Sequence, residues 1–398
     1  MKIILFDPET SGHHIKYASY LIRYLIEQGD IITFITWKPC KSLNLLQNLP
    51  ITIKYIVGSS EENFGGNTIK RKWQLVKGFK YCFNLANVQH VNVVHCLYID
   101  YSEIPLYFCI KKFKHRSWKL FATIFSPYFI HEPKEKIGIM RYLYHKLKGR
   151  IVVQLLKRGE IRGLFTHSER IQDKLFNLCS HDLFCDNIFV IPDPIEPLPK
   201  ISQEVARDYL ELPQKKPIIL FFGGLNHRKG FDVLLKAIPL IDKEVYILIA
   251  GKLDDSIEEE TIQKYRQSLR KPECLIFHLR YIKDGDIAKY FLASDAVILP
   301  YRRGFKGTSG VLNYASVTGK PVIVSDTGEI SHIVRENNLG ILIEPESSEA
   351  IAQGVKRLLS HSKKWREQVK LQAIQYAKSN DWRKMASKVR EIYLKNKE

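Results

Sequence analysis

The sequence predicts an α/β protein of two domains, each with a parallel sheet covered by helices on both faces. Short apolar runs alternate with helix-patterned segments along the whole chain, which is typical of parallel sheets buried on both faces. A proline-rich stretch, IPDPIEPLPK at Ile191–Lys200, divides this alternation into two series of similar length. Proline density of this kind marks a linker, so each series is predicted to form a domain of its own.

The first series contains seven expected strands, each a short apolar run of the length that strands usually have. The segment His14–Gln28 follows the first strand, and in it Ala18, Leu21 and Leu25 recur at helical spacing. The chain therefore begins as strand, loop and helix. The expected strands are Lys2–Phe6, Ile31–Thr36, Ile51–Val57, Asn92–His95, Leu120–Ile124, Gly163–Thr166 and Ile188–Ile191.

The second series repeats the pattern and predicts a second doubly wound, Rossmann-like sheet. We place the N-terminal domain at 1–191, the linker at 192–200 and the C-terminal domain at 201–376. Ligands of such sheets bind at the carboxyl ends of the strands, so we expect a site in a central cleft that both sheets face. The expected strands are Pro217–Phe222, Val245–Ala250, Cys274–His278, Ala296–Leu299, Val322–Val324 and Gly340–Ile343.

Composition is that of an ordinary globular protein. The 398 residues are 45% hydrophobic and 26% charged, and no apolar run approaches the ~20 residues that span a bilayer. The N-terminus, MKIILFDPETSGHH, turns polar after a short strand-like run and has no cleavage site of a signal peptide. The seven cysteines are scattered without a CxxC pair, which argues against a zinc site or a disulfide framework. We expect a cytoplasmic protein.

The formal net charge of +19 indicates an anionic partner. Basic residues interleave with aromatic ones in the N-terminal half, a pattern that suits an anionic membrane surface. A solvated basic face is the other interpretation, and both stay open. No recognised nucleic-acid-binding motif accompanies the charge, so we expect no nucleic-acid partner. The clusters are Lys70, Arg71, Lys72, Lys77 and Lys80; Lys111, Lys112, Lys114, Arg116 and Lys119; and Lys134 through Arg150.

A loop rich in glycine and hydroxyl groups carries the first functional signal. The segment Val297–Ser325, VILPYRRGFKGTSGVLNYASVTGKPVIVS, predicts strand, loop, helix and strand. Its glycines fall at the expected helix N-terminus, where unpaired backbone amides attract anions and above all phosphate. Three cations, Arg302, Arg303 and Lys306, add positive charge, and the first two are expected to contact the ligand. No Asp or Glu lies between Asp295 and Asp326.

A second glycine loop precedes it in the chain. In ILFFGGLNHRKGFDVLLKAI (Ile219–Ile238), a buried strand ends at Gly223 and Gly224. The glycines allow a ligand to approach the backbone closely, and Arg228 and Lys229 follow within reach of a diphosphate. Together the two loops predict a site for a phosphorylated ligand.

These motifs are similar to those of a known protein family. The chain resembles glycosyltransferase family 4, whose members have the GT-B fold, over almost its whole length. The similarity rests on an ordered set of segments: SGHHIKYASYLIRYLIEQGD, NVVHCLY, THSERIQDKL, VIPDPI, FFGGLNHRKGFDVLLKA, ASDAVILPY, TGKPVIVSDTGEI and LGILIEPES. Asp381-Trp382 and the last helix are similar to the family segment that returns to the N-terminal domain, which assigns 377–398 to that helix.

The resemblance implies a transferase for a nucleotide-diphospho-sugar, with a glycan or lipid-linked acceptor in surface polysaccharide or glycolipid synthesis. It implies a hexosyltransferase-like reaction that retains the anomeric configuration and needs neither metal nor cofactor. The donor is held mainly by the C-terminal domain and the acceptor by the N-terminal domain. The implied catalytic residues are Lys229, Arg228 and His95, and the implied donor-binding residues are Gly12, His13, Gly223, Gly224, Tyr281, Lys306, Thr308, Ser309, Gly310 and Val311.

The chain departs from the family pattern at several of its polar positions. Where members carry two glutamates around the second loop, Lys306 and Tyr314 stand here. Because the second of those glutamates binds the nucleotide ribose in the family, either the recognition of the ribose or the donor itself must differ. Gly224 replaces a phosphate-binding arginine, for which Arg228 can compensate, and Phe125 lies near the place of an acceptor-domain histidine.

Some residues and functions keep two interpretations. His13 and His95 suit either a structural or a ligand-contacting role. Asp284-Gly285-Asp286 matches a metal-binding DxD motif but also suits the cap of a helix at Ile287–Leu292. A non-catalytic GT-B-like binding protein, motivated by the missing glutamates, and another GT-B enzyme such as a nucleotide-sugar epimerase are the alternative functions.

Overall fold

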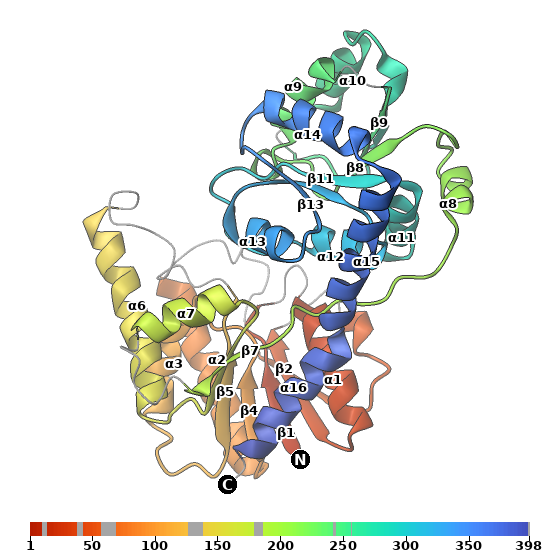
Figure 1. Cartoon of the computed structure of the whole chain (residues 1–398). Coiled ribbons are helices and arrows are strands. Elements are labelled where there is room, and N and C mark those ends of the chain that lie inside the picture. Colours follow the sequence, from red (N-terminus) through yellow and green to blue (C-terminus); the bar gives the residue numbers. More distant parts are fainter. Residues whose placement is uncertain are drawn as a thin grey trace. The chain divides into compact units, whose positions relative to one another are not determined.

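The structure is a computed structural model, and it describes residues 1–9, 14–37, 43–56, 69–125, 138–178, 186–241, 244–255 and 257–396. The chain forms two compact units (Figure 1). Unit 1 comprises Met1–Pro194 and Asp381–Glu398, and unit 2 comprises Ile195–Asn380. Each unit has its own sheet and its own core.

Unit 1 is built on a seven-stranded parallel sheet with the order β3-β2-β1-β4-β5-β6-β7. Buried apolar residues fill most of these strands, as expected of a sheet covered on both faces, whereas the edge strand β3 is largely exposed. The order reverses between β1 and β4, which pair in parallel with Ile3 opposite Val93. The strands are β1 (Lys2–Phe6), β2 (Ile31–Trp37), β3 (Thr52–Ile56), β4 (Val93–Cys96), β5 (Lys119–Thr123), β6 (Gly163–Thr166) and β7 (Ile188–Val190).

Helices cover both faces of this sheet. Alternate residues of β1 enter opposite cores: Ile4 and Phe6 pack with α2 (Ile69–Val88), α3 (Glu103–Ile110), α6 (Ile139–Lys157) and α7 (Glu169–Leu178). Ile3 and Leu5 pack on the other face with α1 (His14–Glu27), η1 (Leu43–Leu45) and α16 (Trp382–Lys395). The end of the chain therefore contributes a helix to the first unit.

The last helix is fixed to unit 1 by polar contacts as well as by packing. Arg390 donates from Nε to Asp30 Oδ2 over 2.7 Å, and Arg383 Nη1 lies 2.5 Å from Glu27 Oε2. Tyr393 is buried and contacts β4 through His95. Because these contacts come from both ends of α16, they hold the whole helix along α1 (Figure 1).

Unit 2 is built on a six-stranded parallel sheet with the order β10-β9-β8-β11-β12-β13. Its order reverses between β8 and β11, and ligands of such sheets bind at the carboxyl ends of the strands at this point. The strands are β8 (Ile218–Phe222), β9 (Tyr246–Ala250), β10 (Leu275–His278), β11 (Ala296–Leu299), β12 (Val322–Ser325) and β13 (Gly340–Ile343).

The second sheet is also covered on both faces. One core contains side chains of α8 (Gln203–Tyr209), α11 (Asp284–Ala293), α12 (Gly310–Val317), α13 (Gly328–Glu336) and α15 (Lys363–Ser379). The other contains side chains of α9 (Phe231–Ala237), η4 (Ile238–Leu240), α10 (Glu259–Gln267) and α14 (Ser348–Ser360). The short helices η3 (His227–Lys229) and η5 (Pro272–Cys274) lie in loops. The predicted class, two parallel sheets with interleaved helices, is confirmed.

Candidate functional site

The two predicted loops meet at the carboxyl edge of the unit 2 sheet. β8 ends at Phe222 and β11 at Leu299, and these strands flank the point where the strand order reverses. The loops touch directly, because the Arg302 amide donates to the Arg228 carbonyl over 3.3 Å. Topology thus brings the two glycine-containing segments together although about 80 residues separate them in the chain.

The backbone conformation at Gly223 makes room for Lys229. Gly223 has φ of +101°, and a Cβ there would collide with Lys229 Nζ. The ammonium group folds back over the loop and donates to the Phe222 carbonyl over 3.1 Å. Asn226 fixes the backbone of Lys229, because its side-chain Oδ1 accepts from the Lys229 amide at 3.1 Å. The glycine therefore positions this cation.

Lys229 is a largely buried cation. Burial, and next the charge of Arg228, lower the pKa of its amine from 10.5 to about 8. At neutral pH the group is therefore protonated but poorly solvated, a state that an anionic ligand stabilises. Because the protonated amine is less stable here than in water, binding of a phosphate group to this loop is electrostatically favourable.

Arg228 lies over an aromatic pair instead of a carboxylate. Its guanidinium carbon is 5.9 Å from the ring centre of Tyr301 and 5.5 Å from that of Phe305. The two rings are stacked with centres 3.8 Å apart. No carboxylate from the described ranges pairs with Arg228 or Lys229, so both charges remain available to a ligand.

Unlike Arg228, both Arg302 and Arg303 form ion pairs with carboxylates. Arg302 pairs with Asp232 at 2.6 Å and with Glu346 at 3.0 Å. Arg303 pairs with Glu344 and, at 3.5 Å, with Glu346. Both guanidinium groups thus pair with carboxylates from neighbouring loops, which favours a role in joining these loops over the expected contact with a ligand.

The second loop presents the N-terminus of α12. Ser309 precedes the helix, but its hydroxyl interacts with the Tyr301 hydroxyl at 3.0 Å and does not cap the helix. The first-turn amides of Gly310, Val311 and Leu312 find no acceptor among the described residues. Thr308 and Lys306 lie on the same loop. Unpaired first-turn amides are the feature that binds anions at helix N-termini.

The remaining predicted donor residues lie elsewhere or outside the described residues. Tyr281 is on the loop after β10 and is 72% exposed. Gly224 is exposed next to Gly223 on the first loop. Gly12 and His13 follow β1 but fall outside the described residues.

His95 is placed by the structure inside unit 1. Its Nδ1 lies 2.5 Å from the Tyr393 hydroxyl and its Nε2 lies 2.7 Å from the Thr123 hydroxyl. Burial lowers the pKa of the imidazole to about 3, so the ring is neutral. Both nitrogens are used to join β4 to β5 and α16. This arrangement favours the structural interpretation of His95 over its implied catalytic role.

At the two positions that carry glutamate in the family, this chain has Lys306 and Tyr314. Another carboxylate, that of Glu329, belongs to a residue whose backbone contacts Lys306. The Tyr314 ring packs on Phe291 with centres 5.4 Å apart. The Lys306 carbonyl accepts from the Glu329 amide over 3.2 Å, and the Glu329 side chain is 9% exposed. Sequence reasoning missed Glu329. The available signal was its place directly after β12, at the same sheet edge as the two loops.

A cavity of about 530 Å³ adjoins the first loop. This volume lies within the usual range for small-molecule sites. Its lining combines cationic, acidic and amide groups, and consists of Asn226, His227, Arg228, Asp232, Asp254 and Ile257.

The DxD-like motif is part of a helix. Asp284 and Asp286 lie in the first turn of α11 and do not cap it, because the cap position is Lys283. Asp286 pairs with Lys289 at 2.6 Å. Within the ranges that the structure describes, no group of three or more His, Cys, Asp or Glu side chains is placed to hold a metal ion.

Comparison with known sequences gives a family match within unit 2 and several partial matches to glycosyltransferases. Residues 202–379 match the profile of a family described as "Glycosyl transferases group 1". An uncharacterized glycosyltransferase of Methanocaldococcus jannaschii is 28% identical over 147 residues, which are 36% of each chain. Glycogen synthase of Thermus caldophilus is 27% identical over 194 residues, 48% of this chain and 41% of that protein. The chain thus spans less than half the length of these relatives.

Solved structures match the whole chain. A glycosyltransferase from Rickettsia africae superimposes with a TM-score of 0.73 at 19% identity, covering 99% of both chains. The HepE protein of Anabaena in complex with UDP-glucose gives a TM-score of 0.67 at 14% identity, covering 99% of this chain and 100% of the other. The chain therefore has the GT-B fold, and its residues 202–379 are similar to the glycosyl transferases group 1 family.

Proposed function

We propose that the chain is a glycosyltransferase that moves a sugar from a nucleotide-diphospho-sugar to a glycan or lipid-linked acceptor. The observation that carries the proposal is the meeting of Arg228, Lys229 and the N-terminus of α12 at one sheet edge. Among the residues that the structure describes, these groups supply two cations without a carboxylate partner and amides without an acceptor. The UDP-glucose complex of the structurally similar HepE protein supports a ligand of this class.

The same groups suit the chemistry of transfer. As the glycosidic bond breaks, the diphosphate leaving group gains negative charge, and fixed donors aimed at that charge lower the barrier. Lys229 and Arg228 are such donors, and Gly223 holds the lysine in place. We propose that these cations make the reaction independent of a metal, and that the anomeric configuration is retained as in the family that the chain resembles.

We assign the ribose contact to Glu329 in this proposal. It is the carboxylate that the backbone contact with Lys306 brings to the second loop. A carboxylate accepts two hydrogen bonds from adjacent ribose hydroxyls, the role that the missing family glutamate fills elsewhere. Glu329→Ala is expected to raise KM for the donor about tenfold or more and to change kcat less. An unchanged KM would remove Glu329 from the site.

The N-terminal unit is proposed to work on an anionic membrane surface. Helices α2 and α6 each carry five Lys or Arg residues and no Asp or Glu. Large apolar side chains are exposed on both, and Lys72 of α2 lies 5.1 Å from the ring centre of Tyr144 on α6. A basic face with exposed aliphatic and tryptophan side chains suits the interfacial region of a bilayer. The exposed residues are Ile69, Trp73, Met140, Leu143 and Leu147.

In the described part of the chain, no helix has the length and apolarity to cross a bilayer. Membrane attachment is tested by sedimentation with vesicles of phosphatidylcholine alone and vesicles containing anionic phosphatidylglycerol. Stronger partitioning onto the anionic vesicles is expected, and Trp73→Ser with Met140→Ser should reduce it. Equal partitioning onto both vesicle types would refute an electrostatic attachment.

A panel of nucleotide-sugars tests the proposed reaction. One member should raise the melting temperature and should be hydrolysed slowly in the absence of an acceptor, with both effects lost in Lys229→Ala. A panel that gives neither a thermal shift nor hydrolysis would favour a non-catalytic binding protein.

A further inference from the structure

A second basic cavity lies at the opposite edge of the unit 2 sheet. It occupies about 410 Å³ next to the amino ends of β8, β11 and β12. Six of the residues that line it are cationic and two are acidic. The proposed donor site uses none of them, because its loops follow the carboxyl ends of the same strands. The cationic residues are Arg207, Lys215, Lys216, Lys320, Arg366 and Lys370.

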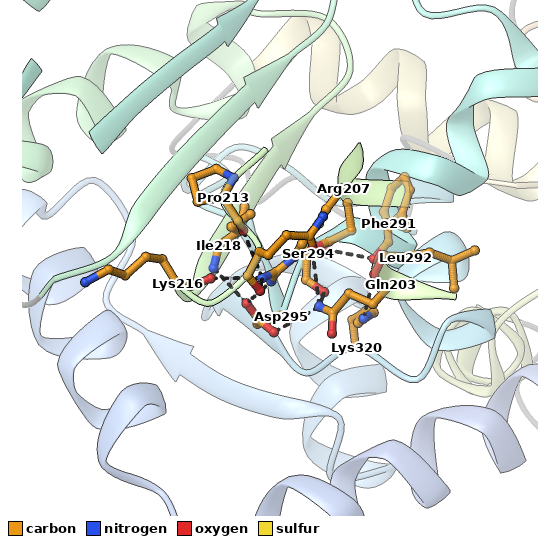
Figure 2. A network of polar contacts seen from close by, with 12 residues as sticks. Gln203, Arg207, Pro213, Lys216, Ile218, Phe291, Leu292, Ser294, Asp295 and Lys320 are labelled. Atoms are coloured by element: carbon orange, nitrogen blue, oxygen red, sulfur yellow. Dashed lines mark hydrogen bonds and ion pairs between the residues drawn. The ribbon is translucent and has the colours of Figure 1, made fainter. Parts of the chain in front are cut away.

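Arg207 organises one wall of this cavity (Figure 2). Its Nη1 donates to three carbonyl oxygens of the loop before β8, those of Pro213, Gln214 and Lys216, at 2.6 to 3.2 Å. Its Nη2 pairs with Asp295 at 2.8 Å. The buried guanidinium therefore fixes the loop that carries Lys215 and Lys216.

Asp295 is held in this network, and Lys216 pairs with Glu244 at 2.7 Å outside it. Besides Arg207, Asp295 accepts from the Ile218 amide at 2.8 Å and from the Gln203 side chain at 3.1 Å (Figure 2). The second acidic residue, Glu367, is 3.7 Å from Lys370. In the described structure no carboxylate lies at ion-pair distance from Lys215 or Lys320.

Lys320 supplies a partly buried ammonium group to the cavity. Its Nζ donates to the Leu292 carbonyl over 3.1 Å (Figure 2), which leaves two of its three protons without a described acceptor. Burial lowers the pKa of this amine to about 8; Asp295 opposes the shift, and Arg207 and Lys370 add to it. An anion bound in the cavity would relieve this cost.

Gly319 lets α15 approach the loop that carries Lys320. It has φ of +66°, and a Cβ there would come within 2.7 Å of Lys370 Cγ. Lys370 and Arg366 lie one turn apart on α15, both at the exposed rim of the cavity. Cations therefore converge from three elements, namely the loop before β8, the loop before β12 and helix α15.

We propose that this cavity is a binding site for a small phosphorylated ligand, distinct from the donor site. Its volume accommodates a phosphate or a sugar phosphate, and the excess of cations matches a dianion. Helix α12 runs from the donor loop at Gly310 to the turn at Thr318, which lines the cavity. The proposal does not depend on the transferase reaction, since it concerns other residues.

Titration calorimetry of the full chain with glucose 1-phosphate, and separately with inorganic phosphate, tests the site. Lys320→Met is expected to weaken binding of glucose 1-phosphate at least tenfold. Because substitution of a partly buried residue can disturb folding, Arg366→Ala with Lys370→Ala provides a rim variant, for which at least fivefold weakening is expected. Lys364→Ala, an exposed lysine on α15 outside the cavity, should bind like the parent.

Two results would overturn the proposal. One is equal affinity for both probes in the parent, the Lys320 variant and the rim variant. The other is binding that disappears in Lys229→Met and survives in the rim variant, which would assign the anion to the donor loop. Inorganic phosphate that competes with glucose 1-phosphate supports recognition of the phosphate group. Turnover of nucleotide-sugars, measured separately in Lys229→Met, reports on the transferase proposal alone.

Discussion

The carboxyl edges of the two sheets share a topology but differ in how their charged side chains are compensated. In unit 1, Asp7 lies 3.3 Å from His14, and buried Glu103 lies 2.9 Å from Lys148. In unit 2, Lys229 and Arg228 have no carboxylate partner in the described structure. Balanced charge suits a neutral hydroxyl-rich group, whereas uncompensated cations suit a diphosphate. The comparison supports a division of labour in which unit 2 binds the donor.

The largest expected effect comes from removing the cation of unit 2. Lys229→Ala should lower kcat about 10²- to 10³-fold, because a fixed donor to the leaving group is lost. Steady-state kinetics with the donor found in the panel measures it. Lys236→Ala, an exposed lysine on α9, serves as the control and should keep full activity. A folded Lys229→Ala protein with parental activity would contradict the claim that the cations of unit 2 bind the diphosphate of the donor.

A smaller loss is expected when the lysine is displaced but kept. Gly223→Ala places a methyl group where Lys229 Nζ lies and at φ of +101°, so we expect a loss of about 10- to 100-fold in kcat. Gly285→Ala on α11 is the matched control, since a Cβ there would meet nothing within 4 Å. Equal activities of the two variants would show that the lysine is not held by this glycine.

Acid should destabilise unit 1 through His95. Its pKa is about 3 when folded and 6.5 when exposed, so below pH 6.5 the unfolded chain takes up a proton that the folded chain does not. The stability that neutral His95 contributes is full above pH 6.5 and is lost as the pH falls towards 3, by up to about 1.4 kcal/mol per pH unit.

Urea unfolding at pH 7, 6 and 5 measures this dependence. His95→Gln should flatten it, whereas the exposed His115→Gln in the same unit should not. An unchanged slope in His95→Gln would mean that another group controls the acid response.

The smallest effect is expected from the arginines that are already neutralised. Arg302→Ala removes pairs with Asp232 and Glu346 near the surface, and such pairs contribute about 0–1 kcal/mol. Activity should stay within about threefold of the parent, whereas Arg228→Ala should lose about tenfold or more. Donor kinetics of both variants under the same conditions would sharpen the distinction between paired and unpaired cations.

Sequence alone predicted the strands and the position of the second-unit loops, because continuous apolar runs and glycine clusters are local signals. It did not predict which cations are neutralised, since Arg303 finds Glu344 41 residues away. The contact of His95 with Tyr393 spans 298 residues and depends on α16 returning to unit 1. The fold-back of Lys229 depends on a positive φ at Gly223, and the place of Glu329 depends on strand order. These are tertiary properties that spacing does not encode.

The central claim is that protonated Lys229 binds the diphosphate of the donor, and the pH dependence of nucleotide affinity tests it most directly. Titration calorimetry with the preferred nucleoside diphosphate should show affinity that falls between pH 7 and pH 9.5, because the pKa of this amine is about 8 in the free protein. Lys229→Met should bind weakly at both pH values and lose this dependence. Equal affinity of the parent and Lys229→Met at pH 7 would contradict the account.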